Sequence, residues 1–217
     1  MSTYNLTVGG NYITYGGKAL TVGSSDTFVV IGGKSYRTTI LPDGNEWLAV
    51  DLDYVWDGLS VPTSSASLTT DQQAVYYDYN DDTYGLLYNW YAVKYLDDNR
   101  STLLPEGWRV PSIQNYANVR NILGGWQNYE TKLKSTTGWL SPTTNGTDDY
   151  GFSWVPSGRF AVENNTPPPV FSGKGRDGAL WTRTSETSEL ADEVSPVGEG
   201  AVFKNYHFAV RLVRYIQ

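Results

Sequence analysis

The chain has 217 residues, with 16 Lys and Arg against 23 Asp and Glu, no Cys and a single His. The lack of Cys excludes disulfides, thiolate zinc sites and a Cys nucleophile, and the lone His207 excludes zinc sites that need a His pair. The net charge of −7 argues against a nucleic-acid-binding surface, and no apolar run approaches the roughly 20 residues of a membrane span. We expect a folded domain that uses no metal or cofactor and binds neither nucleic acid nor membrane.

Residues 1–33 predict a β-rich N-terminal arm. They are poor in charged residues, and the phrase L-T-V-G at residues 6–9 recurs at residues 20–23. Short β-branched runs between Gly pairs are typical of hairpins, so we expect three or four short strands. Because so short a hairpin segment does not stabilise itself, the arm is either an ordinary β-extension packed on the rest of the chain or an anchoring and oligomerisation element.

The main domain, residues 34–217, opens with two predicted strands. They cover residues 35–40 and 46–52, and the turn sequence P-D-G-N at residues 42–45 joins them. Residues 57–72 are rich in Ser and Thr and contain Gly and Pro, which predicts a surface loop.

Two short helices are predicted next. Apolar residues spaced three and four apart predict one helix over residues 85–96. Ser112 is a suitable N-cap for the second helix, whose apolar stripe runs from Ile113 to Leu123. The glycine pair at residues 124 and 125 is expected to end it.

The remaining residues predict short strands separated by loops. Strands are expected at Trp139 and at residues 152–155, 158–162, 179–182 and 208–213. Loops are expected at residues 164–169 and 172–178. The pattern as a whole predicts an α+β fold, with two short helices against a small, irregular antiparallel sheet.

Five phrases of the sequence resemble, in the same order, phrases of one protein family. They are Y-G-L-L-Y-N-W-Y-A at residues 84–92, L-P-E-G-W-R-V-P-S at 104–112, L-K-S-T-T-G-W at 133–139, N-G-T-D-D-Y-G-F-S at 145–153 and F-A-V-R-L-V at 208–213. The family they resemble is the Fibrobacter succinogenes major paralogous domain, which is related to the formylglycine-generating enzyme group and to the variable proteins of diversity-generating retroelements. The resemblance covers residues 28–217 and implies a C-type-lectin-like fold, but it indicates no particular chemistry.

The resemblance also assigns most of the Trp residues to the core. A buried Trp removes on the order of 200 Å² from solvent, so these side chains would dominate the packing. The Trp residues in the family blocks are Trp90, Trp108, Trp139, Trp154 and Trp181.

Two positions depart from the family pattern in the same way. Leu104 stands where the family has a Cys before P-x-G-W, and Leu212 stands where it has a Cys in the closing strand. In relatives these positions look like a disulfide pair, so the resemblance implies that two apolar side chains replace it. Such a replacement suits a chain that folds in a reducing compartment. A third departure lies at residues 181–186, which are one residue longer than the family's W-S-S-T-E and leave the local turn uncertain.

The sequence offers little for catalysis. His207 has no accompanying nucleophile motif, so we expect it to serve packing or the surface. The resemblance suggests one activity, formylglycine generation. That activity resembles a Cys-dependent chemistry, and this chain has no Cys. Asp51 with Asp53, and Asp81 with Asp82, are paired carboxylates, but without a partner acid at a defined distance they do not indicate a glycosidase. We expect them to be solvated loop charges. We therefore expect no enzyme.

A calcium site is the main open alternative. Asn145, Asp148 and Asp149 carry the oxygen ligands that Ca²⁺ prefers. The same N-G-x-D pattern is also typical of a tight turn in which Asn and Asp bind the local backbone. The sugar-binding signatures of C-type lectins are absent, which favours the structural turn.

Binding is expected on loops, because loops carry recognition in this fold. The acidic segment 76–84 is dense in Tyr, a residue that offers contact area at low entropic cost, although packing against the domain is the alternative. The predicted binding residues are Tyr76, Tyr77, Tyr79, Tyr84, Asn164, Asn165, Lys174 and Arg176.

The features together predict a non-enzymatic structural or adhesion protein of a phage virion. Residues 1–6 lack a secretory pattern, so we expect synthesis in the host cytoplasm and display on the virion surface as a head fibre, tail fibre or decoration protein. The arm would bind other virion proteins and form a homotrimer, and the lectin-like domain would bind a host glycan or surface protein. A bacterial cell-surface adhesin or carbohydrate-binding module is the alternative, and an enzyme is a third, weaker hypothesis.

Overall fold

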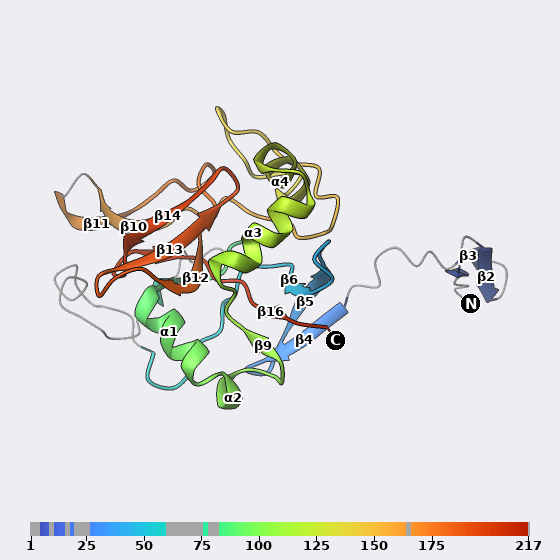
Figure 1. Ribbon diagram of the computed structural model, residues 1–217, viewed down its shortest axis with the longest axis horizontal. Helices are drawn as coiled ribbons and strands as arrows, with labels where there is room; N and C mark the ends of the chain where they lie inside the picture. The colour runs from blue at the N-terminus through green and yellow to red at the C-terminus, as the bar shows by residue number, and fades with distance from the viewer. Residues whose placement is uncertain are drawn as a thin grey trace.

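The computed structural model describes residues 27–59, 83–163 and 166–216, together with the strands at residues 5–8, 11–15, 18–19 and 76–77. Side chains are described within residues 27–59, 83–161 and 171–216. In this part of the chain four helices accompany antiparallel sheets, so the predicted α+β class is confirmed (Figure 1). None of these helices is long and apolar enough to cross a membrane.

One five-stranded sheet joins the two ends of the described domain. Its strands, in spatial order, are β4 (Thr27–Ile31), β5 (Lys34–Ile40), β6 (Glu46–Leu48), β16 (Val213–Arg214) and β9 (Trp108–Arg109). The turn between β5 and β6 forms as predicted, since the Leu41 N–H donates to the Asn45 carbonyl over 3.1 Å. Strand β4 lies within the expected arm and pairs with β5 across residues 32 and 33, although the division of the chain at residue 33 stays a prediction.

Three further sheets complete the strands. The second has the order β11 (Thr166–Ser172), β10 (Arg159–Glu163), β15 (His207–Phe208), β8 (Leu87–Asn89) and β7 (Tyr76–Tyr77). The third is the meander β12 (Leu180–Ser185), β13 (Leu190–Ser195) and β14 (Gly198–Phe203). The fourth is β1 (Asn5–Val8), β2 (Asn11–Tyr15) and β3 (Lys18–Ala19), where short strands were expected.

The helices are α1 (Trp90–Asp98), α2 (Arg100–Leu103), α3 (Ile113–Ile122) and α4 (Trp126–Leu133). Asn89 caps α1, with its side-chain oxygen accepting from the Ala92 N–H over 2.9 Å, and Ser112 begins α3 as predicted. The prediction of two helices was wrong, because α2 and α4 were missed. Gly124 and Gly125 take φ of +86° and +106°, so the glycine pair ends α3 and at once starts α4.

Several strand predictions also needed correction. No strand forms at Trp139, and at residues 152–155 a single bridge joins Trp154 to Lys134. Residues 166–169, expected to be a loop, belong to β11, which tolerates its prolines because it is an edge strand. The closing strand expected at residues 208–213 is two short strands in different sheets.

The five Trp residues of the family phrases are buried, as predicted, with exposed fractions of 0–7%. They divide between two apolar clusters, one containing Trp90, Trp108 and Trp181 and the other Trp139 and Trp154. Leu104 and Leu212, which replace the family's Cys, are both buried in the first cluster. Apolar packing therefore occupies the positions where the resemblance implies a disulfide.

Candidate functional site

The turn at residues 145–153, where a calcium site was the alternative, is held by hydrogen bonds to its own side chains. Asp148 accepts hydrogen bonds from the Ser153 N–H and hydroxyl, both over 2.6 Å, and Asn145 accepts from the Trp139 N–H over 3.0 Å. A Cβ on Gly146 would lie 2.3 Å from the Lys134 carbonyl oxygen, so glycine is required there. These contacts favour the structural turn over the calcium site. Among the described residues, no cluster of His, Asp and Glu could hold a metal.

The loop at residues 173–178 is hydrogen-bonded to the chain on either side of that turn. The Leu140 N–H donates to the Gly175 carbonyl over 2.7 Å, and the Asp177 N–H donates to the Gly173 carbonyl over 2.7 Å. Trp154 Nε1 donates to the Gly178 carbonyl over 2.6 Å. Backbone bonds of this kind fix the loop that carries Lys174 and Arg176.

A cavity of about 180 Å³ lies between this loop, α4 and strands β10, β13 and β14. That space holds roughly six water molecules at about 30 Å³ each. Aromatic and aliphatic side chains form much of its wall, with charged groups among them. The lining includes Trp139, Thr143, Ala179, Ser195, Pro196, Val197, Val202, Tyr206 and Phe208, with Glu130, Lys134, Arg159, Arg176, Asp177 and Glu193 as the charged residues.

The charged groups of the cavity form two ion pairs. Lys134, which is 1% exposed, lies 3.0 Å from the Glu130 carboxylate and has its ammonium 4.2 Å from the centre of the Trp139 ring. Arg159 lies 3.5 Å from the Asp177 carboxylate at the exposed side. Sequence analysis missed both pairs: Glu130 and Lys134 are four residues apart at the end of the unpredicted helix α4, and the fold brings Arg159 to Asp177.

Glu193 is the exception among the carboxylates of the cavity. Its Oε2 is buried and, in the described structure, accepts no hydrogen bond. Burial raises the pKa of Glu193 to about 7, although the nearby Arg159 acts in the opposite direction. A buried acceptor without a donor calls for an explanation, and this one faces a cavity.

The predicted binding residues meet this site only in part. Arg176 is exposed and lines the cavity, and the Lys174 ammonium lies 4.9 Å from the ring centre of Tyr84. The backbones of Tyr76 and Tyr77 form the edge strand β7, but their side chains lie outside the described residues. Outside them altogether are Tyr79, Asn164 and Asn165.

The role of His207 is packing. The side chain is fully buried, and its ring lies edge-on to Phe160 with 5.5 Å between ring centres. Burial lowers the pKa of His207 to about 3, so the imidazole is neutral at ordinary pH. This agrees with the structural interpretation of His207.

The expectation of solvated charges was wrong for Asp51, whereas Asp53 is partly exposed, and Asp81 and Asp82 lie outside the described residues. Asp51 is buried and pairs with Arg211 over 2.8 Å, and Asp53 accepts hydrogen bonds from Lys34 and Tyr36. Asp51 is therefore part of a buried ion pair, and Asp53 is part of a network near the surface.

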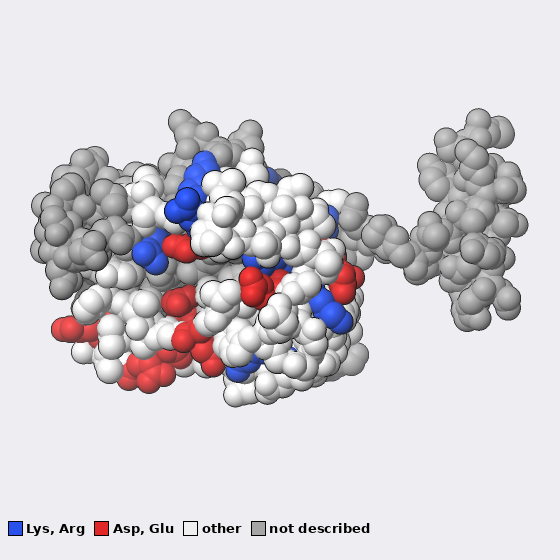
Figure 2. Space-filling model, turned by 90° about the horizontal axis from the view of Figure 1, so that it is seen from above, with Lys and Arg blue, Asp and Glu red and all other residues white. Residues whose placement is uncertain are grey.

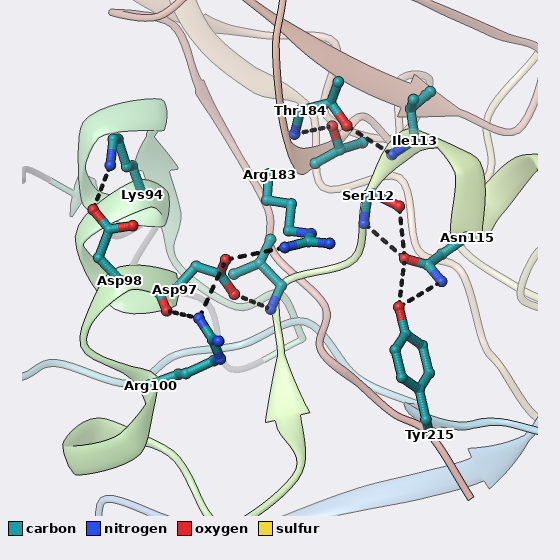
Figure 3. Close-up of polar contacts among 12 residues, drawn as sticks. Lys94, Asp97, Asp98, Arg100, Ser112, Ile113, Asn115, Arg183, Thr184 and Tyr215 are labelled. Atoms are coloured by element: carbon teal, nitrogen blue, oxygen red, sulfur yellow. Dashed lines mark hydrogen bonds and ion pairs between the residues drawn. The ribbon is translucent and has the colours of Figure 1, made fainter.

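A second concavity lies between α1, the start of α3 and β12. Figure 3 shows Arg100 and Arg183 pointing toward the Asp97 carboxylate, at 4.0 and 3.9 Å. Asp97 also accepts from the Val110 N–H over 3.1 Å, and Lys94 pairs with Asp98. Because these charges already interact with one another, this groove has a weaker claim to a ligand than the cavity.

Many acidic side chains gather at the lower left of the face in Figure 2, whereas basic side chains are scattered over it in small groups. Asp192 is buried, and the pKa of its carboxyl rises to about 6 because of that burial and of the nearby Glu186 and Glu199. Glu186 and Glu199 thus lie close enough to Asp192 to oppose its ionisation.

The fold and the site define an α+β domain. Its five family-like phrases supply buried Trp residues to the core, and a small cavity lined by charges of both signs lies beside that core. The sequence model of the Fibrobacter succinogenes major domain family matches residues 43–214, and the chain belongs to that family. Comparison with curated proteins gives no match, and comparison with solved structures gives none either.

Proposed function

We propose that this protein is a non-enzymatic binding protein whose cavity holds a small polar group of its target. The observation that carries the proposal is the cavity itself, in which aromatic walls surround opposed charges and the Glu193 Oε2, which accepts no hydrogen bond in the described structure. Binding sites combine apolar walls with a few placed polar groups in this way. The space is well below the roughly 300–1,000 Å³ of sites for drug-sized ligands, so one sugar residue or one side chain is the appropriate size.

The proposed target is a host glycan or surface protein, and the proposed location is the surface of a phage virion. Supporting this, Leu104 and Leu212 fill the core where a disulfide is implied in relatives, which fits folding in a reducing cytoplasm. The proposal includes a C-type-lectin-like fold, because the family resemblance implies that fold. The alternative is a bacterial surface adhesin or carbohydrate-binding module, and neighbouring capsid, portal or tail genes would distinguish the two.

The Arg176→Ala variant tests the cavity. We expect it to weaken binding to the best glycan or protein ligand found on an array by about tenfold, because a charge-assisted hydrogen bond contributes roughly 1.5–3 kcal/mol. Arg176 is exposed, so the fold should be unaffected. Arg183→Ala is the matched control, since Arg183 is also exposed and lines the other groove. Equal losses in both variants, or none in Arg176→Ala, would place binding elsewhere.

Residues 1–26 are proposed to assemble the protein. We expect the full chain to be a trimer by light scattering and the chain from residue 27 onward to be a monomer. The deletion ends at residue 26 because β4 pairs with β5 and would be lost in a longer one. A monomer in both cases would exclude the assembly role.

A further inference from the structure

The carboxylates of the cavity differ in whether they have a partner. Glu130 pairs with Lys134 over 3.0 Å and Asp177 pairs with Arg159 over 3.5 Å. Glu193 extends from β13 into the same cavity, and its Oε2 is buried without a hydrogen bond. The site therefore presents one carboxylate for which the described chain supplies no bonded cation.

We infer that the cavity receives an ammonium group of the ligand, with Glu193 as its counter-charge. This rests on the proposed function and names the chemical class that the same cavity would recognise. A primary ammonium is carried by an amino sugar or by a lysine side chain. Both sources share the same chemistry at Glu193.

The chain already holds one ammonium of its own in the wall of this cavity. Lys134 combines a carboxylate, Glu130, with the face of an aromatic ring, Trp139. Tyr206 and Phe208 line the same cavity as Glu193, so it offers a ligand ammonium both a carboxylate and aromatic rings. The Lys134 arrangement is thus a template for the proposed contact.

An ammonium meets the need of Glu193 better than a neutral hydroxyl does. A hydroxyl satisfies one lone pair, but it leaves a negative charge in a low-dielectric site. An ammonium supplies both the hydrogen bond and the opposite charge. Selectivity for an amine over its acetylated form is the expected signature.

Binding should also depend on the ionisation of Glu193. Burial raises the pKa of this carboxyl to about 7, with Asp177, Asp192 and Glu199 acting in the same direction and Arg159 in the opposite one. The carboxyl is then about one-tenth ionised at pH 6 and about nine-tenths ionised at pH 8, while a lysine amine stays protonated throughout. Affinity for a lysine amine should rise about tenfold over this range.

The test is calorimetric titration of the full chain with N-acetyl-lysine methylamide and with a glucosamine trimer, each against its N-acetylated counterpart. We expect the free amines to bind at least tenfold more tightly, with the lysine probe tighter at pH 8 than at pH 6. The two amine arms show whether a peptide or a sugar is the better carrier. Glu193→Gln should lose both the affinity and the pH dependence, whereas Glu189→Gln, an exposed site outside the cavity, should keep both.

Equal binding of amine and acetylated probes, unchanged affinity in Glu193→Gln, or no binding of either amine would overturn the inference. The proposed function fails separately. If array binding is lost in Arg176→Ala but is insensitive to Glu193→Gln, the cavity still binds a ligand, and only the ammonium assignment is wrong.

Discussion

Replacing Arg211 with Met is expected to lower the free energy of unfolding by about 3–5 kcal/mol. This is the usual cost of leaving one member of a buried ion pair without its counter-charge, about 3–5 kcal/mol. Arg211 is fully buried, and its Nε donates to Asp51 over 2.8 Å. Its other donors reach the Phe152 carbonyl and, over 2.8 Å, the Ser153 carbonyl. One guanidinium therefore links the closing segment to residues 51 and 152–153.

Urea denaturation measures this effect, and two further variants interpret it. Lys94→Met removes an exposed ion pair with Asp98 and should cost less than about 1 kcal/mol. The double variant Arg211→Met with Asp51→Leu should recover part of the loss, because no charge is left buried. A cost for Arg211→Met no larger than that of Lys94→Met would show that the buried pair does not organise the domain.

Replacing Trp154 with Ala is expected to cost about 3–5 kcal/mol, as is usual for a fully buried aromatic side chain. Trp154 is 0% exposed, and its ring lies 5.5–6.2 Å from the rings of Tyr116, Tyr129 and Phe152. It also bonds the Gly178 carbonyl beside the cavity. The loss should therefore affect both stability and the geometry of the binding loop.

Trp154→Phe separates these two contributions. It keeps most of the packing and removes the Nε1 donor, so we expect a loss of about 1–2 kcal/mol and weaker ligand binding. Trp126→Ala is the control, because Trp126 is only partly buried and should cost about 1 kcal/mol. Melting of all three variants at the same temperature would contradict this account of the core.

Local signals in the sequence predicted local structure well. The turn at residues 42–45 and the start of α3 at Ser112 follow from short-range preferences, and both are present. The glycine pair at residues 124 and 125 ends α3 as predicted, but the start of α4 was missed, because the φ values that end one helix also permit the next to begin. Short-range rules do not decide between these outcomes.

Contacts between residues far apart in the chain could not be predicted from the sequence. Asp51 and Arg211 are 160 residues apart, so no spacing rule connects them, and Asp51 was misinterpreted as a solvated charge. The cavity has the same origin, since Lys134, Arg159 and Glu193 lie on separate elements. The exposed loop position of Arg176 was predicted and is present, whereas its role in binding stays a prediction. The cavity position of Glu193 could not be predicted. Asp192 and Glu193 point to opposite faces of β13, and only the fold decides which face meets the cavity.

The most direct test of the central claim uses the Trp indole N–H signals in a nitrogen–proton correlation spectrum. Trp139 lines the cavity, Trp90 lines the groove beside α1, and Trp108 lines a third concavity near β9. Titration with the best-binding glycan or with N-acetyl-lysine methylamide should shift the Trp139 signal and leave those of Trp90 and Trp108 in place. A shift confined to Trp90 or Trp108 would contradict the assignment of the cavity as the binding site.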